Sequence, residues 1–387
     1  MRLGQRVVLS LFGVKPVRIG GVEIYARELS SQLAAHGWGS VLCFLDEPPE
    51  PVRRYLELPN VSIDVAPYCT EQSFRAGSQV WSLIRRHRPE IFHLQFTPFI
   101  SPHAWSARVN SVSKIFFTDQ GSRPEGFVIH PAPSWKQIIA KLINWPITRV
   151  IGISDYVIEC EQGAGLISPS RLTRIYNATD LSRVRQDPSL RREFRDRHGI
   201  PRDRLLVTQV SWIIPEKGIL DLLEAARLAI AQKSDLHFAL AGEGIHRAAY
   251  SQKAMELGIA QHVTWTGLVQ DPFGEGLYAA TDILCQMSRW EEAFGWVIAE
   301  AMTFGLPVVA TRVGGISELV SDSVTGFLVA RGDTEAMAEK IVLLAGDSSL
   351  RETLGNRGRA LAEREFEIHR NVEQVLRLYG IAPGSRS

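Results

Sequence analysis

Two glutamates, Glu292 and Glu300, stand at either end of a short apolar stretch, EEAFGWVIAEAM (291–302). If this stretch is helical, the two side chains are separated by ~12 Å of rise and point to within about 80° of each other. Such a spacing suits a ligand that carries hydroxyl groups at both ends and an anion between them, as in a sugar–diphosphate–ribose unit. In that arrangement Glu292 would bind sugar hydroxyls and Glu300 would bind ribose hydroxyls.

The middle of the same stretch favours an anion. The first amides of a helix are unpaired and the helix dipole attracts negative charge, so a diphosphate would lie there. Gly295 lets the backbone approach a ligand closely. The alternative is that one acid lies at a helix N-terminus and the other pairs with a nearby cation. Spacing alone favours that alternative.

The length and composition predict a globular chain of two domains. The composition, 45% hydrophobic and 22% charged, is typical of a globular protein. A chain of 387 residues is too long to fold around one ordinary hydrophobic core. The formal net charge of +1 gives no electrostatic reason to expect a nucleic-acid partner. The cysteines have no paired spacing, so we expect reduced packing residues rather than a disulfide or zinc site at Cys43, Cys69, Cys160 and Cys285.

The apolar start of the chain is better explained as a first strand than as a signal peptide. The run VVLSLF (7–12) is short and no small-residue cleavage site follows it. No run approaches the ~18 apolar residues of a membrane span. We therefore expect a cytoplasmic protein whose membrane contact, if it has any, is peripheral.

Short apolar runs alternate with helical patterns along the chain, which predicts parallel sheets covered by helices, an α/β architecture. Helical periodicity is clear over 20–37 and 218–232. Strands are predicted at 6–12, 40–45, 90–96, 113–119, 149–154, 204–212, 236–244, 263–269, 282–287, 307–311 and 326–330. Ligands on such sheets bind at the carboxyl ends of the strands, so the loops that follow the strands are the places to look for a site.

The segment SRWEEAFGWVIAEAMTFGLPVVATRVGGISELV (288–320) resembles the donor-site signature of retaining glycosyltransferases with the GT-B fold, family four in particular. The order of acid, small residue, Phe-Gly, second acid, Gly-x-Pro-Val-Val and Gly-Gly is kept throughout. The resemblance extends over nearly the whole chain. It implies two Rossmann-like, doubly wound domains that face each other across a cleft.

The resemblance implies where the domain boundaries lie and which domain binds the acceptor and which the donor. We expect an acceptor-side domain over 1–186, a charged linker with two prolines over 187–204, and a nucleotide-sugar-binding domain over 205–366. A C-terminal helix over about 367–387 is expected to return to the first domain.

In the family signature, the acid at Glu300 binds the ribose and the acid at Glu292 holds hydroxyls of the donor sugar. Backbone amides around Phe294 and Gly295 would contact the sugar and the phosphate. The glycine pair 314–315 in GGISEL is expected to be structural rather than ligand-contacting.

The segment VSWIIPEKGILDLL (210–223) resembles the family's Pro-Glu-Lys-Gly turn, where a basic pair neutralises the leaving diphosphate. Lys217 falls at the position of the family's lysine, and its point charge suits a phosphate. Trp212 stands where the family usually has arginine. This departure removes one cation and puts turnover in question; Arg289 and Arg123 are possible substitutes.

Weaker likenesses extend the donor-binding set. The segment LAGEG (240–244) resembles a family segment close to the nucleotide, and backbone near Val269 is placed to read the base edge. The loop KPVRIGGVEIY (15–25) resembles the glycine-rich loop that precedes the first helix. The alternative for that loop is an ordinary strand-to-helix turn. These likenesses add five residues to the predicted donor site: Gly20, Gly21, Gly242, Glu243 and Val269.

Two further residues are expected near the reaction. His93, in FHLQF (92–96), matches one histidine of a strand end that often carries His-x-His, although a single histidine is as often structural. Asp119 lies in FFTDQGSRPEG (116–126), where many members place a histidine beside the reacting sugar. Three landmarks fix the alignment rather than a role: Ser154, Asn177 and Asp180. The predicted catalytic set is thus Glu292, Lys217, His93 and Asp119.

The segment SWKQIIAKLINW (134–145) places its apolar residues on one helical stripe, with two lysines off it. This pattern suits a helix at a membrane interface. It suits a helix packed on the first sheet equally well, and we take packing as the expected outcome.

The resemblance predicts a metal-independent, retaining transfer of a sugar from a nucleotide donor to a glycan or lipid-linked acceptor in bacterial surface polysaccharide or glycoconjugate synthesis. The chain has no Asp-x-Asp metal motif, so no metal and no separate cofactor are expected. Two alternatives stay open. One is a sugar-nucleotide epimerase or hydrolase on the same fold, and the other is a catalytically impaired sugar-nucleotide-binding protein.

Overall fold

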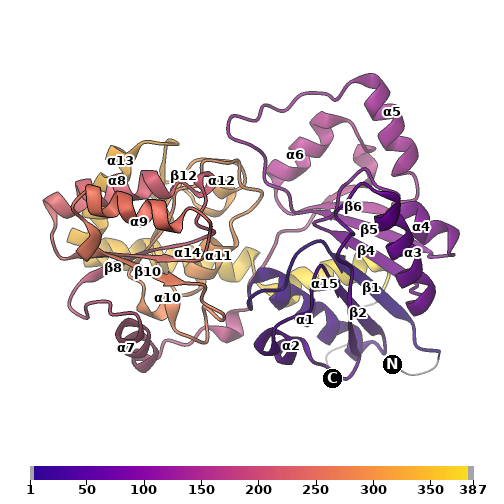
Figure 1. Cartoon of the computed structure of the whole chain (residues 1–387), viewed down its shortest axis with the longest axis horizontal. Helices are drawn as coiled ribbons and strands as arrows, with labels where there is room; N and C mark the ends of the chain where they lie inside the picture. The colour runs from indigo at the N-terminus through magenta and orange to yellow at the C-terminus, as the bar shows by residue number, and fades with distance from the viewer. Residues whose placement is uncertain (1–3, 382–387) are drawn as a thin grey trace. The chain divides into compact units, whose positions relative to one another are not determined.

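The computed structural model describes residues 4–381, which form two compact units. The first unit contains the described residues up to Gly121, Val128–Ala178 and the C-terminal segment from Ile368. The second contains Ser122–Phe127 and Thr179–Glu367. Each unit is a parallel sheet with helices on its faces, as Figure 1 shows by the labelled strands of each.

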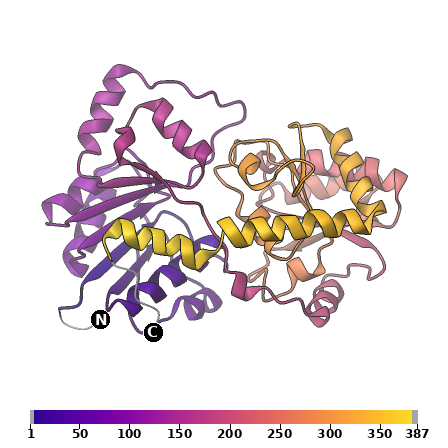
Figure 2. The ribbon, with the colours of Figure 1, turned by 180° about the vertical axis from the view of Figure 1, so that it is seen from behind.

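The first unit has a seven-stranded parallel sheet in the order β3-β2-β1-β4-β5-β6-β7. Its strands are β1 (Val7–Phe12), β2 (Gly39–Phe44), β3 (Val61–Val65), β4 (Ile91–Gln95), β5 (Lys114–Asp119), β6 (Arg149–Gly152) and β7 (Leu172–Arg174). Its helices are α1 (Gly21–Ala35), α2 (Glu50–Leu56), α3 (Phe74–His87), α4 (His103–Val109), α5 (Ser134–Ile143), α6 (Asp155–Ala164) and α15 (Ile368–Tyr379). Figure 2 shows α15 lying across this sheet.

The second unit has a six-stranded parallel sheet in the order β10-β9-β8-β11-β12-β13. Its strands are β8 (Leu205–Val210), β9 (Leu236–Ala241), β10 (Val263–Gly267), β11 (Ile283–Gln286), β12 (Val308–Thr311) and β13 (Gly326–Val329). Its helices are α7 (Pro188–Arg197), α8 (Ile219–Gln232), α9 (Arg247–Glu256), α10 (Leu277–Ala280), α11 (Trp296–Thr303), α12 (Ile316–Leu319), α13 (Thr334–Gly346) and α14 (Ser348–Glu365).

Helix α8 illustrates why the sequence folds this way. Its apolar residues Ile219, Leu222, Leu223 and Ala226 recur at helical spacing and are all at most 1% exposed. They join the core cluster of the second unit, which also includes Ile341 of α13. The amphipathic stripe therefore fixes which side of the helix faces the sheet.

All the predicted strands are present, and the two predicted helices are α1 and α8. The pattern did not predict β3 and β7. Strand β3 is the edge strand of its sheet and its residues are only partly buried, so its sequence VSIDV alternates and lacks a continuous apolar run. Strand β7 has three residues and lies at the opposite edge. The four cysteines are free and buried, as predicted.

The structure places the crossing between the units earlier than the sequence analysis did. The chain passes from the first unit to the second between Ala178 and Thr179. Residues expected to form the linker instead form α7 in the second unit, where Arg195 is 1% exposed and binds Asp282 at 2.8 Å. The prolines and charges of this segment are typical of a linker. The sequence pattern does not show that Arg195 is buried against Asp282, because the two residues are 87 positions apart. Helix α15 belongs to the first unit.

The expectation that residues 134–145 pack on the sheet is wrong. In α5 only Ala140 is buried. The stripe itself is exposed, with Trp135 at 63%, Ile138 at 61% and Leu142 at 64%. The helix is formed as predicted, but its apolar face points away from the core.

Candidate functional site

The centre of the candidate site is an ion pair between Lys217 and Glu292. The lysine Nζ lies 2.5 Å from Glu292 Oε1. The hydroxyl of Ser288 donates to the same oxygen at 2.5 Å. The hydroxyl of Ser122 donates to Oε2 at 3.2 Å. Both carboxylate oxygens are therefore held, and all these residues belong to the second unit.

The surroundings keep Glu292 ionised. Burial would raise the pKa of this carboxyl, which is only 7% exposed. The charge of Lys217 and the hydrogen bonds from Lys217, Ser288 and Ser122 outweigh burial and leave the pKa below its ordinary value. The lowered pKa adds stability above the unfolded carboxyl pKa, and this is lost as the pH falls through the folded pKa.

The loops after β8 and β11 bring this pair together. Lys217 ends the 3₁₀ turn Pro215–Lys217 that follows β8. Ser288 and Glu292 come after β11, which is the parallel neighbour of β8. The carboxyl ends of parallel neighbours meet at one edge of the sheet, so the two loops emerge side by side. Backbone bonds tie them, since the amide of Arg289 donates to Glu216 O at 2.9 Å.

Gln209 braces the two loops from inside β8, and sequence reasoning did not single it out. Its Nε2 donates to the carbonyl of Lys217 at 2.7 Å. Its Oε1 accepts from the amide of Met287 at 3.2 Å. The signal was available, because Gln209 is the only amide side chain in the apolar run LLVTQV.

Gly218 sets how closely these loops pack. It has a φ of +64°, and a Cβ built on it would lie 1.8 Å from the carbonyl oxygen of Met287. Any side chain here would push the Lys217 turn away from the loop that carries Ser288. The glycine is therefore required for contact as well as for conformation.

We expect Gly218→Ala to destabilise the protein by at least about 3 kcal/mol, because left-handed strain and a backbone clash add together. The matched control is Gly258→Ala, where φ is +69° and nothing lies within 4 Å of the added carbon. The control is expected to lose only about 1 kcal/mol. Urea denaturation measures both. Equal losses in the two variants would show that the contact with Met287 does not matter.

Glu300 lies on α11 and is 2% exposed. Its Oε2 accepts a hydrogen bond from the hydroxyl of Tyr278, on α10. The structure corrects the premise that the two glutamates share one helix. Helix α11 begins at Trp296, so Glu292 lies in the preceding loop. Gly295, with a φ of +112°, caps the helix and turns the chain between the two acids.

The other predicted donor-binding residues of the second unit line the strand ends. Gly242 follows β9, and a Cβ there would lie 1.9 Å from the carbonyl oxygen of Ser211. Glu243 pairs with Arg247 at 3.1 Å. Val269 is 3% exposed and Phe294 is 2% exposed, so contact from their side chains is blocked in this structure. Phe294 instead packs edge-on against Phe366, with centroids 5.4 Å apart.

A second ion pair, also missed from the sequence, supports the loop that carries Glu292. Arg331 binds Glu291, and Glu291 Oε2 accepts from the amide of Gly314 at 2.9 Å. A Cβ on Gly314 would lie 2.2 Å from the carbonyl oxygen of Glu292. Gly314 therefore acts in packing, as expected for the Gly-Gly turn.

Of the two cations suggested as substitutes for the missing arginine, Arg289 has a side chain that is already paired with carboxylates. Arg289 binds Asp221 and Glu125, each at 3.0 Å. Arg123 exchanges backbone hydrogen bonds with Glu291, both at 2.9 Å. Trp212 itself is 52% exposed. The guanidinium of Arg289 is therefore already shared between two carboxylates.

His93 lies in the core of the first unit, on β4, with no exposed surface. Its Nδ1 is 2.5 Å from the hydroxyl of Tyr379 and its Nε2 is 2.7 Å from Thr118 Oγ1. Burial lowers the pKa of His93 to about 3. Both nitrogens are used within the core and the ring is neutral, so we leave His93 out of the proposed catalytic set.

The remaining predicted residues of the first unit lie at strand ends. Asp119 ends β5, is 8% exposed and accepts from the amide of Gly121 at 2.9 Å. Gly20 precedes α1 and its amide donates to Glu23 Oε2 at 3.0 Å. Gly21 is the first residue of α1. The landmark Ser154 caps α6 by accepting from the amide of Val157 at 3.1 Å.

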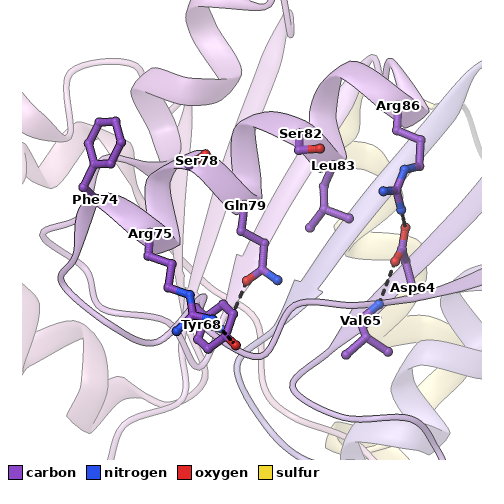
Figure 3. Close-up of a pocket in the computed structure, with 10 residues that line it drawn as sticks. All are labelled: Asp64, Val65, Tyr68, Phe74, Arg75, Ser78, Gln79, Ser82, Leu83 and Arg86. Carbon is purple, nitrogen blue, oxygen red and sulfur yellow. Dashed lines mark hydrogen bonds and ion pairs between the residues drawn. The ribbon is translucent and has the colours of Figure 1, made fainter.

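A cavity of about 620 Å³ in the first unit lies between α3 and the end of β3. Figure 3 shows its charged groups already paired: Arg86 binds Asp64 at 2.7 Å. Arg75 lies over the ring of Tyr68, 3.4 Å from its centroid. None of the residues predicted for the site lines this cavity, so it is not part of the candidate site.

Comparison with known proteins identifies the family. Residues 19–183 match the family model described as Glycosyltransferase Family 4. Residues 191–361 match the model described as Glycosyl transferases group 1. The two matches are consecutive and together span most of the chain. The chain belongs to the family 4 glycosyltransferases of the GT-B fold.

Individual relatives agree with this assignment. The chain is 27% identical to N-acetyl-alpha-D-glucosaminyl L-malate synthase of Bacillus anthracis over 380 residues, 93% of this chain and 94% of the relative. It is 27% identical to alpha-D-kanosaminyltransferase of Streptomyces kanamyceticus over 65% of this chain and 66% of the relative. The Anabaena protein HepE, solved with UDP and glucose, has a TM-score of 0.78 at 20% identity, covering 97% of this chain and 99% of that one.

In this glycosyltransferase, the Lys217–Glu292 pair and Glu300 lie in the segment matched by the group 1 model. Gly20, His93 and Asp119 lie in the segment matched by the Family 4 model. The Lys217–Glu292 pair and Glu300 thus belong to the second unit.

Proposed function

We propose that this chain is a retaining, metal-independent glycosyltransferase that moves a sugar from a nucleotide-sugar donor to a glycan or lipid-linked acceptor in bacterial surface polysaccharide or glycoconjugate synthesis. The observation that carries the proposal is the Lys217–Glu292–Ser288 cluster at the strand ends of the second unit, in which Glu292 and Ser288 are buried and Lys217 is partly exposed. HepE, which shares the fold, is solved with UDP and glucose, and this supports a nucleotide-sugar donor. We expect the protein to work in the cytoplasm.

Lys217 is proposed to neutralise the diphosphate as it leaves. An ammonium group has three protons, and only one is needed for Glu292. The other protons are free to bind phosphate oxygens, so Glu292 aims the lysine as well as binding the sugar. Preorganised charge of this kind acts most strongly where negative charge develops in the transition state.

Glu300 is proposed to accept hydrogen bonds from the ribose hydroxyls. Its carboxylate is held by Tyr278 on one oxygen, which fixes the orientation of the group before a ligand binds. Asp119, Gly20 and Gly21 of the first unit are proposed to lie near the acceptor and the diphosphate. Because retention needs no covalent nucleophile in a front-face reaction, the leaving phosphate itself is proposed as the base.

The first experiment is a thermal-shift panel of nucleotide sugars. A ligand that binds only the folded state raises the melting temperature, by an amount that grows with ligand concentration over Kd. We expect one or a few nucleotide sugars, and their free nucleoside diphosphates, to stabilise the protein. A flat panel of nucleotide sugars would contradict the proposal.

Donors found in this way are then incubated with and without acceptors, and products are followed by NMR. Transfer with retention at the anomeric carbon, unchanged in EDTA, supports the proposal. Among residues 4–381, no group of three or more His, Cys, Asp or Glu side chains is placed to hold a metal ion, so the EDTA arm is the test of metal independence. Rapid epimerisation or hydrolysis without an acceptor would favour the first alternative function.

Trp212 is the observation that keeps a binding role in view. It is exposed where the family usually has a cation, and Arg289, one suggested replacement, is paired with Asp221 and Glu125. Tight donor binding with no transfer to any acceptor would support a sugar-nucleotide-binding protein. Gain of transfer in Trp212→Arg would then identify the missing cation as the reason.

A further inference from the structure

The first unit carries an exposed apolar face that the proposed reaction does not use. Helix α5 presents Trp135, Ile138, Ile139 and Leu142 on one stripe, with exposed fractions of 43–64%. Trp145, which follows the helix, is 60% exposed. Figure 1 shows α5 at the margin of this unit, beside α6. Large apolar patches of this kind mark interaction surfaces.

The face is continued by neighbouring segments. Trp105 of α4 is 39% exposed and stacks on Trp145, with ring centroids 5.9 Å apart. We call these six residues the α5 face: Trp105, Trp135, Ile138, Ile139, Leu142 and Trp145.

The opposite side of α5 is anchored to α6. Gln137 donates to the carbonyl of Ala132 at 2.8 Å. The amide of Ala132 donates to the carbonyl of Ala164, next to the end of α6, at 3.1 Å. Gln137 also lies within contact distance of Gly165, as the side-chain space around that glycine shows. The helix is thus held by its polar side, and this leaves the apolar side outward.

The charged side chains of residues 126–154, the segment that carries α5, are all basic. No Asp or Glu occurs between Glu125 and Asp155, whereas His130, Lys136 and Lys141 lie in that interval. At 100° per residue, the two lysines project roughly 110° to either side of the stripe. Their stems can lie along an apolar surface while their ammonium groups reach polar groups at its boundary.

We infer that the α5 face binds the surface of an anionic lipid bilayer. The stripe inserts among the acyl chains near the head groups, the tryptophans lie at the interface, and the flanking lysines bind lipid phosphates. A helix of ten residues is about 15 Å long, so it lies along the membrane and does not cross it. Within residues 4–381, the helices lack the length and apolar character that a membrane span requires.

A lipid surface fits these observations better than a protein partner does. The α5 face is one side of a helix, and its residues line neither of two cavities in the first unit, one at α3 and the end of β3 and the other beside Arg6 and Arg88. Lysines on both flanks of the stripe can contact the negatively charged lipid head groups on either side of the helix. This inference does not depend on which sugar is transferred.

The test is sedimentation of the full chain with vesicles of phosphatidylcholine alone, or with about one third phosphatidylglycerol. We expect binding to the anionic vesicles, weakened by salt. Ile138→Ser with Leu142→Ser should lower the partition coefficient about tenfold or more, because the stripe loses its apolar area. The matched control is Ile245→Ser with Met255→Ser, two exposed apolar residues of the second unit, and it should bind as the wild type does.

Lys136→Gln with Lys141→Gln should reduce binding to anionic vesicles about tenfold and leave binding to neutral vesicles unchanged. Failure of the wild type to bind anionic vesicles would overturn the inference. So would a concentration-dependent dimer that is lost in the serine variant, since that outcome assigns the face to a second copy. Stabilisation by the nucleotide sugar should be equal in all variants, so the inference and the proposed function can fail separately.

Discussion

Replacing Lys217 with methionine is expected to lower kcat/KM for sugar transfer by about 10²–10³-fold. Methionine keeps an unbranched stem but removes the charge that we propose for the departing diphosphate. The loss should appear mainly in kcat, because negative charge on the leaving group is greatest in the transition state. Steady-state kinetics with the donor identified by thermal shift measure the effect.

The lysine and its glutamate should act as one unit. Lys217 Nζ and Glu292 Oε1 are 2.5 Å apart, so removing either partner leaves the other without its counterpart. We expect Glu292→Gln to reduce transfer more than it reduces binding of the free nucleoside diphosphate. The double variant should lose little more than the worse single one. Additive losses would show independent roles.

Lys253→Met is the matched control for the charge change. Lys253 lies on α9 of the same unit and pairs with Glu256 at 3.8 Å near the surface. Its removal should leave transfer within about twofold of the wild type, since an exposed pair of this kind contributes little. If Lys217→Met also retains more than half of the activity, the assignment of the leaving-group cation is wrong.

Glu300→Ala is expected to raise the Kd for the nucleoside diphosphate about 10–100-fold, because a hydrogen bond to a charged group contributes about 1.5–3 kcal/mol. The carboxylate is proposed to accept from both ribose hydroxyls. Calorimetry with the free diphosphate measures the change without depending on chemistry. Glu335→Ala, an exposed acid in the first turn of α13, is the control and should bind normally.

The ligand provides a second control for this prediction. A 2′,3′-dideoxynucleoside diphosphate lacks the hydroxyls that Glu300 is proposed to bind. The wild type should lose affinity for this analogue, whereas Glu300→Ala should bind it as weakly as it binds the natural ligand. If the variant still discriminates between the two ligands, Glu300 does not read the ribose.

Neighbouring residues in the sequence were enough to predict the sheet architecture. Buried strands of a parallel sheet are continuous apolar runs, so β8, β9 and β12 could be recognised individually. The edge strand β3 could not, since half-exposed residues have no such run. The sequence also could not predict that the chain passes to the second unit at Ala178–Thr179. Residues after Thr179, such as Arg195, belong to the second unit through contacts with distant segments, as in the ion pair with Asp282.

The candidate site, too, could be predicted only in part from the sequence. The order of residues around Glu292, Phe294 and Glu300 indicated a donor site from the sequence alone. The sequence could not show that the helix begins only at Trp296. Gly295 has a φ of +112°, which is outside the helical range, so Glu292 and the residues that follow it up to Gly295 lie before the helix. Nor could the sequence show that Lys217, 75 positions away, binds Glu292.

The sequence by itself determined the two sheets and the family, because periodic burial and a motif are properties of consecutive residues. Only the tertiary structure decided that His93 is a core residue and that the α5 face is bare. An amphipathic stripe specifies that a helix has an apolar side, but which surface covers that side depends on where the neighbouring chain lies in space.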